Sequence, residues 1–118
     1  MINYPKRIKK LLRELMTQAY ERELHRELTK LDQSFAEWRD GKLSSGELSN
    51  RVHQFEIGPS RELFKRYNDG ALDMMVAYAI VAGILHENEV PRELSETIDA
   101  HLTFFRSLKE QGKLRMPK

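Results

Sequence analysis

The chain has 118 residues, of which 40% are hydrophobic and 32% are charged, a composition typical of a single globular domain. Twenty basic and 18 acidic residues give a formal net charge of +2, so no strong overall field favours nucleic acid or membrane surfaces. The absence of cysteine excludes disulfides, thiolate metal sites and a cysteine nucleophile, and it fits a reducing compartment. Because Lys6–Lys10 stand where the apolar segment of a secretory signal would begin, we expect a cytoplasmic protein.

The first predicted element is a long helix that begins at Pro5 and meets no further proline or glycine before Gly41. Proline suits the first position of a helix, and glycine suits the residue just past its end. Apolar residues form a broad stripe of helical period near the N-terminus and a narrower, heptad-like stripe further along. The broad stripe consists of Ile8, Leu11, Leu12, Leu15, Met16, Ala19 and Tyr20, and the narrow stripe of Leu24, Leu28, Leu31, Phe35 and Trp38.

The length of this helix predicts an oligomer. An unbroken helix of about 36 residues would extend about 54 Å, whereas a compact domain of this size has a diameter of roughly 35 Å. The helix would overhang its own globule and leave the broad stripe exposed, unless it bends back. No breaker residue marks a bend, so packing on a second copy is favoured. This predicts a homodimer with an interface at Ile8, Leu11, Leu12, Leu15 and Ala19.

Two shorter helices are predicted next. Ser44, three residues before Glu47, is a capping-box signature that begins the first of them. Gly58-Pro59 is expected to stop that helix, because proline lacks an N–H donor and restricts the residue before it. Pro59 can then open a short helix over residues 59–67, which the turn sequence Asn68-Asp69-Gly70 follows.

Residues 71–85 are the apolar centre of the sequence, interrupted only by Asp73 and Gly83. A helix that is apolar on every side must be wrapped by other elements. At about 1.5 Å per residue it reaches about 22 Å, short of the roughly 30 Å of a bilayer's hydrocarbon core. We therefore predict a buried central helix, in which Ala79 and Gly83 let another helix approach closely.

The last helix is predicted to begin at Val90-Pro91 and to end at Gly112, and residues 113–118 are expected to form a loose basic tail. The sequence contains no internal repeat, low-complexity tract or interdomain linker. We thus predict one all-α domain over residues 1–118. It is a four- to five-helix bundle with a long N-terminal helix and a buried apolar central helix.

Motifs for metal binding or catalysis do not occur in the sequence. A di-metal carboxylate site in a helix bundle uses Glu-x-x-His pairs, and none is present; His53, for example, precedes Glu56 in the reverse order. There is no HExxH spacing, nucleophile elbow or phosphate loop. Ser44, Ser45 and Ser60 stand at predicted helix starts, where their hydroxyls are explained as caps. We expect no metal, no cofactor and no enzymatic activity.

The most distinctive pattern covers residues 53–67. A helix that starts at Pro59 offers free N–H groups and partial positive charge, and nearby basic residues add full charge, a combination that binds carboxylate or phosphate. The candidate ligand-binding residues are His53, Ser60, Arg61, Lys65 and Tyr67. The favoured interpretation is a plain helix–helix corner, in which Glu62 pairs with Arg66 and the aromatic residues fill the core.

This stretch resembles one found in short bacterial all-α proteins of uncharacterised function. In those proteins a histidine and an aromatic residue precede a Gly-Pro-Ser-Arg-Glu-Leu segment. The matching residues are His53, Phe55, Gly58, Pro59, Ser60, Arg61, Glu62 and Leu63. The resemblance covers a minority of the chain; it implies a bacterial cytoplasmic origin and no activity.

Residues 1–13 hold five bases and no acid. On a helical wheel Lys6, Lys9, Lys10 and Arg13 lie opposite apolar residues, an arrangement that can meet a nucleic-acid backbone or an anionic membrane. No recognition-helix signature or aromatic stacking surface accompanies them. The favoured function is therefore a non-catalytic, homodimeric protein-interaction or regulatory protein, with or without a further protein partner. A nucleic-acid-binding regulator and an anionic-ligand binder at the Arg61 corner are the alternatives, and membrane binding is not expected.

Overall fold

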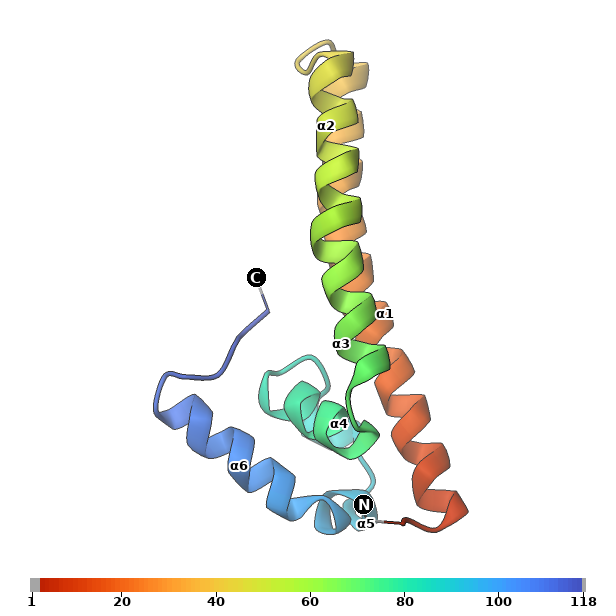
Figure 1. Cartoon of the computed structure of the whole chain (residues 1–118), viewed down its shortest axis with the longest axis vertical. Coiled ribbons are helices and arrows are strands. Elements are labelled where there is room, and N and C mark those ends of the chain that lie inside the picture. Colours follow the sequence, from red (N-terminus) through yellow and green to blue (C-terminus); the bar gives the residue numbers. More distant parts are fainter. Residues whose placement is uncertain (1–2, 118) are drawn as a thin grey trace.

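The structure is a computed structural model that describes residues 3–117, and this part of the chain is all-α (Figure 1). Helix α1 (Lys6–Arg39) is unbroken over 34 residues, as the lack of a breaker predicts. The chain then turns and runs antiparallel to α1 through α2 (Ser45–Phe55), η1 (Glu56–Ser60) and α3 (Arg61–Asp69). It ends with α4 (Leu72–Val81), η2 (Glu87–Glu89), α5 (Arg92–Thr97) and α6 (Asp99–Glu110).

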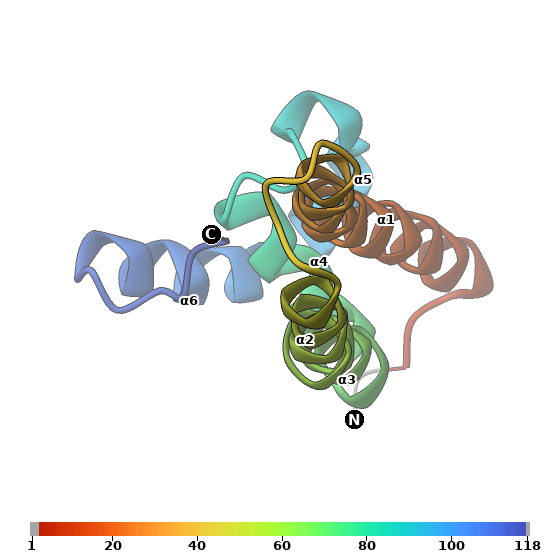
Figure 2. The ribbon, with the colours of Figure 1, turned by 90° about the horizontal axis from the view of Figure 1, so that it is seen from above.

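The molecule is elongated, with a radius of gyration of 17.3 Å and extents of 53 × 33 × 26 Å. A compact chain of this length has a radius of gyration of about 13.5 Å. The predicted overhang of the long helix is therefore confirmed, but the projecting part is its C-terminal half. We call the projecting hairpin, residues 24–60, the arm, and the rest of the molecule the base. Seen from above, α6 extends sideways from the base, away from the paired helices (Figure 2).

The hydrophobic core lies in the base and confirms a buried central helix. Val76, Ala77 and Ala79 of α4 are 0% exposed. The N-terminal half of α1 packs on α4 from one side, and α6 packs on it from another. Apolar residues that these helices and α5 contribute are Ile8, Leu12, Leu15, Ala19, Leu94, Ile98 and Leu102.

This packing corrects the predicted dimer interface. Ile8, Leu12, Leu15 and Ala19 are 0–6% exposed within the single chain, and half-buried Leu11 packs against the same core. The broad stripe is covered because the second half of the chain folds back onto it. A second copy would have to bind elsewhere on the surface.

The central helix is shorter than predicted, and Gly83 follows its C-cap residue Ala82 instead of forming a close helix contact. Gly83 has φ +82°, a left-handed conformation in which a side chain is strained. Its N–H donates to the Ile80 carbonyl at 3.2 Å, and the Ile84 N–H donates to the Ala79 carbonyl at 2.9 Å. Ile84 and Leu85 lie beyond the helix yet stay buried, so the apolar run continues into the core as a turn.

Gly58-Pro59 does not stop the second helix, and the predicted break there is wrong. The backbone stays in the right-handed helical region from Phe55 (φ −61°, ψ −46°) to Arg61 (φ −69°, ψ −42°). Residues 56–60 form a π-helical turn with Pro59 inside it. The wider turn accommodates Pro59 because the proline ring presses less on the preceding turn than it would in an α-helix.

Two further expectations at the C-terminal end are corrected. The predicted last helix is interrupted at Ile98, whose φ of −103° and ψ of 19° separate α5 from α6 while Leu94 and Ile98 both stay buried. The tail was predicted to be loose, but its described part, residues 113–117, contacts the base. Leu114 packs against the core, and the Tyr78 hydroxyl donates to the Arg115 carbonyl at 2.6 Å. Lys118 lies outside the described residues.

Candidate functional site

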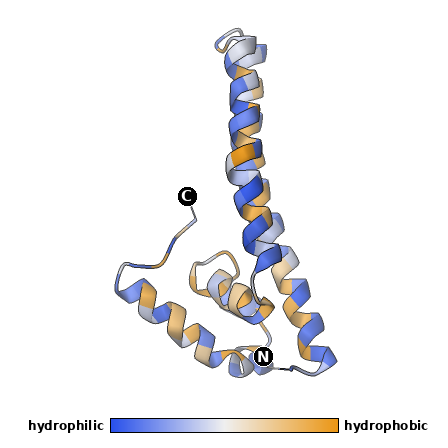
Figure 3. Ribbon diagram, in the orientation of Figure 1, coloured by the Kyte–Doolittle hydropathy of each residue, from blue (hydrophilic) through white to orange (hydrophobic). Residues whose placement is uncertain are grey.

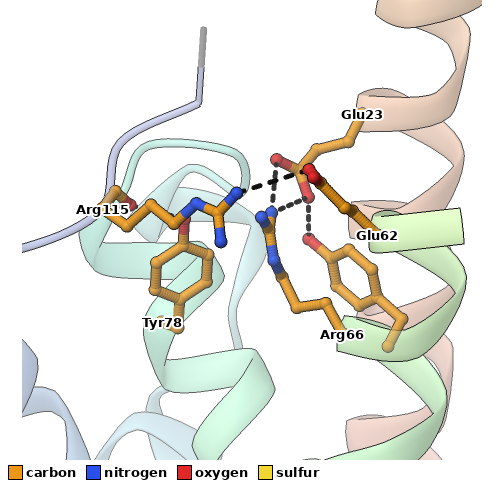
Figure 4. A network of polar contacts seen from close by, with 6 residues as sticks. Glu23, Glu62, Arg66, Tyr78 and Arg115 are labelled. Atoms are coloured by element: carbon orange, nitrogen blue, oxygen red, sulfur yellow. Dashed lines mark hydrogen bonds and ion pairs between the residues drawn. The ribbon is translucent and has the colours of Figure 1, made fainter. Parts of the chain in front are cut away.

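A buried polar network joins α1 to α3 where the arm meets the base (Figure 4). The Glu23 carboxylate accepts hydrogen bonds from the Tyr67 hydroxyl at 2.6 Å and from Arg66 Nη1 at 3.3 Å. Glu23 is 5% exposed and Tyr67 2%. Burial, together with the hydrogen bond to Glu23, raises the pKa of Tyr67 far above its usual value, so the phenol stays a donor.

The C-terminal tail covers this network. The Arg66 guanidinium lies 5.8 Å from the centre of the Tyr78 ring, and Arg115 pairs with Glu62 at 3.4 Å (Figure 4). Among the described residues no buried side-chain nitrogen or oxygen lacks a hydrogen-bond partner. The buried polar atoms of the network thus find their partners within the chain. We therefore assign these residues a structural role as the joint between arm and base.

Within the arm, the contact between α1 and α2 is partly polar. Ser34 is 7% exposed, and its hydroxyl accepts a hydrogen bond from Arg51 Nη1 at 3.0 Å. Arg51 also pairs with Glu37 at 3.3 Å. At the tip, Ser44 Oγ accepts from the Glu47 N–H at 3.1 Å, which confirms the predicted helix cap. The seam of the arm thus includes polar contacts where a two-helix pair usually places apolar ones.

The narrow heptad stripe of α1 lies beside the buried contact with α2, and only part of it faces that helix: Leu31 lines a groove with Arg51 and Phe55. Leu24 follows Glu23, and Phe35 follows Ser34, so each stands about 100° around the helix from a residue of the buried seam. Leu28 is 45% exposed and Trp38 is 40% exposed. Leu24, Leu31 and Phe35 are half-buried. The stripe is therefore partly covered, at Leu24 by the core of the base, and is exposed at Leu28 and Trp38.

Residues from the antiparallel helix extend this apolar side. Trp38 Nε1 donates to Ser45 Oγ at 3.0 Å, and Val52, seven residues further on and 38% exposed, lies on the same side of α2 as Ser45. In α3, Phe64 is 57% exposed and stands about 200° from Glu62, which faces the tail. We call this set the outer face: Leu24, Leu28, Leu31, Phe35, Trp38, Val52 and Phe64. Figure 3 shows hydrophobic positions recurring along the arm, beyond the core of the base.

The residues predicted to bind an anion do not converge. Because no helix begins at Pro59, the free N–H groups expected there are absent. His53, Arg61 and Lys65 are exposed and Ser60 is half-buried, whereas Tyr67 is buried in the joint. His53 and Tyr67 lie about 21 Å apart along the helix, at about 1.5 Å per residue. The premise for a ligand site at this point is therefore wrong.

The predicted basic surface is present at the start of α1. Lys6, Lys10 and Arg13 are exposed, and Lys9 is half-buried with its Nζ donating to Asn3 Oδ1 at 3.1 Å. Arg7, between them, forms an ion pair with Glu93 of α5. The basic residues therefore divide into a free set and a set tied to neighbouring side chains.

In the described part of the chain, residues 3–117, no cluster of three or more histidine, aspartate or glutamate side chains is placed to hold a metal ion. No helix within the same residues combines the length and the apolar character needed to cross a bilayer. Comparison with protein-family models, with curated proteins and with solved structures found no match for this chain. The outer face and the basic surface are therefore the two features of this chain that point to a function.

Proposed function

We propose that this protein is a non-catalytic, homodimeric interaction protein whose two copies meet through the outer face of the arm. The observation that carries the proposal is that α1 has, within the arm, one buried side with polar contacts and one partly exposed apolar side. The buried contact toward α2 contains Ser34, bonded to Arg51, whereas the heptad stripe beside it exposes Leu28 and Trp38. An exposed apolar patch of this extent is typical of a contact surface.

A second copy is the partner that fits this surface. A two-helix arm has a thin core, and two such arms laid face to face form a four-helix bundle, in which each arm covers the other's apolar stripe. A twofold axis brings the same face of both copies together. Residues 24–60 hold five basic and six acidic side chains, so two arms do not repel each other strongly.

The size of the outer face sets the expected strength. From Leu24 to Trp38 it is about 21 Å long, and two helices are about 20 Å wide, which gives roughly 400 Å² of flat area per copy. Two copies bury somewhat more than twice this area as accessible surface, which is close to the lower limit of about 1,000 Å² for specific interfaces. We therefore expect a dimer that forms in the micromolar range and dissociates on dilution. Without disulfides, such a protein suits a reducing compartment such as the cytoplasm.

Light scattering coupled to size-exclusion chromatography tests the proposal. At micromolar concentration the mass should be about twice the 13.9 kDa of the chain. Leu28→Asp combined with Phe35→Asp should give a monomer with unchanged helicity. The matched control is Phe104→Asp, an equally apolar position that is 51% exposed on α6, outside the arm, and it should leave the dimer intact. A monomeric unmutated chain, or equal loss of the dimer in the control, would refute the proposal.

A nucleic-acid-binding regulator is the second candidate, favoured by one observation. Lys6, Lys10 and Arg13 are exposed and form no ion pair with a described residue, although the chain is rich in acids. Binding to duplex DNA or RNA should then fall steeply as salt rises, and it should be lost in Lys6→Glu with Lys10→Glu. Absence of binding at low salt would leave the dimerising protein as the only candidate.

A further inference from the structure

A cavity of about 490 Å³ opens in the base between the start of α1, the start of α4 and α6. This volume is within the range of about 300–1,000 Å³ that is typical of small-molecule pockets. Its apolar wall is formed by Leu12, Leu72 and Met74. The cavity lies away from the arm, so it is independent of the outer face and of the proposed dimer.

One side of the cavity is an ordered hydrogen-bonded group centred on Asp73. The Asp73 carboxylate accepts from the Tyr4 hydroxyl at 2.8 Å and from the Met74 N–H at 2.8 Å, and it lies 3.1 Å from His101 Nε2. Burial alone would raise the pKa of Asp73, but these hydrogen bonds and the nearby His101 ring bring it below its usual value. Asp73 is therefore an anion held in place by Tyr4, the Met74 N–H and His101.

Two cationic side chains, Lys9 and Arg13, also line the cavity. Lys9 is half-buried and holds Asn3, while the Arg13 guanidinium forms no ion pair or hydrogen bond with any residue of the described chain. A free guanidinium beside an apolar wall favours a ligand with one anionic end and a hydrocarbon body. Asp73 in the same wall repels a doubly charged group, so a single negative charge is preferred.

We propose that this cavity binds a small apolar carboxylate, with its carboxylate held by Arg13 and Lys9 and its hydrocarbon part against Leu72 and Met74. Arginine matches a carboxylate with two parallel N–H donors, and lysine adds a point charge. Tyr4 and His101 keep the wall in place through Asp73. The ligand class is thus an acyl or aryl acid of moderate size.

Isothermal titration calorimetry with decanoate, decanol and decyl phosphate tests the ligand class. Decanoate should bind at least tenfold more tightly than the other two, because decanol lacks the charge and decyl phosphate carries a second one. Equal affinity for decanoate and decanol, or absence of decanoate binding, would overturn the proposal.

Matched variants test the location. Arg13→Glu should weaken decanoate binding at least tenfold, whereas Lys10→Glu makes the same charge change on an exposed position that does not line the cavity and should change it less than twofold. Met74→Trp, which fills the cavity without changing its charge, should also remove binding while helicity is kept. Loss of binding in Leu28→Asp with Phe35→Asp would place the ligand on the outer face and overturn the assignment, whereas unchanged binding supports it.

Discussion

The joint between arm and base can be tested by removing one atom. Tyr67→Phe deletes the hydroxyl that donates to Glu23 at 2.6 Å and keeps the ring, which stacks on Tyr20 with 5.4 Å between ring centres. Glu23 then stays buried with Arg66 as its remaining partner. A hydrogen bond to a charged group contributes about 1.5–3 kcal/mol. In a chain of this size about 1 kcal/mol corresponds to roughly 3–6 °C in Tm, so we expect a Tm lower by about 5–15 °C.

Urea unfolding followed by far-UV circular dichroism, at one protein concentration for all variants, measures this loss. Tyr20→Phe is the control, because the Tyr20 hydroxyl is half-buried and has no hydrogen bond with the described residues. It should stay within about 0.5 kcal/mol of the unmutated chain. The raised pKa of folded Tyr67 adds a second test, because its stabilising effect is complete below the unfolded tyrosine pKa of 10.0 and is lost as the pH rises through the folded value.

Equal destabilisation by the two tyrosine variants would refute the reasoning, because it would trace the effect to the ring surface instead of the hydrogen bond. A change of less than about 0.5 kcal/mol in Tyr67→Phe would refute it as well, since a buried carboxylate would then lose its closest donor at no cost.

Three further predictions follow from local geometry. Gly83→Ala should lower the free energy of unfolding by about 1–2 kcal/mol in urea, because a side chain is strained at φ +82°; unchanged stability would contradict this. The hydrogen bond from Arg22, with one from a backbone N–H, lowers the pKa of Glu89 from 4.5 to about 2, so its stabilising effect is present above pH 4.5 and is lost as the pH falls toward 2. Arg22→Met should reduce this acid dependence in thermal melts at several pH values. An unaltered profile would show that the Arg22–Glu89 pair does not stabilise the fold. Burial and the hydrogen bond to Asp73 raise the pKa of Tyr4 to about 12. Asp73→Asn should therefore lower the alkaline midpoint of a phenol absorbance titration. An unchanged midpoint would show that Asp73 does not influence the ionisation of Tyr4.

Much of the fold was predictable because its signals are local. The 34 residues of α1 contain neither glycine nor proline, and Ser44 caps the next helix as its spacing to Glu47 predicts. Gly58-Pro59 failed as a stop signal because packing along α1 holds the antiparallel helix together on both sides. A π-helical turn then absorbs the proline, and local preference is overridden by tertiary contact.

The candidate surfaces were less predictable, because a single sequence does not show which elements cover which stripe. Both apolar stripes of α1 are visible in the sequence, but only the structure shows that α4 covers the broad one and that Leu28 and Trp38 of the narrow one stay exposed. Glu23 looks like any other helical glutamate, since its partner Tyr67 is 44 residues away. Asp73 and His101 are similarly 28 residues apart, and nothing in their local sequence marks the pairing.

The change of partners along α1 explains why the two halves of this helix differ. Its first half meets more than one helix of the base, so a broad apolar stripe is buried there. Its second half packs mainly along the antiparallel helix, and Glu23 and Ser34 occupy that contact with hydrogen bonds whose geometry fixes the register of the arm. Because polar contacts add little hydrophobic stabilisation, covering the exposed apolar side chains of the arm would add to its stability. In the proposed dimer a second arm supplies that cover, so we expect dimerisation to depend on the outer face rather than on the buried N-terminal stripe.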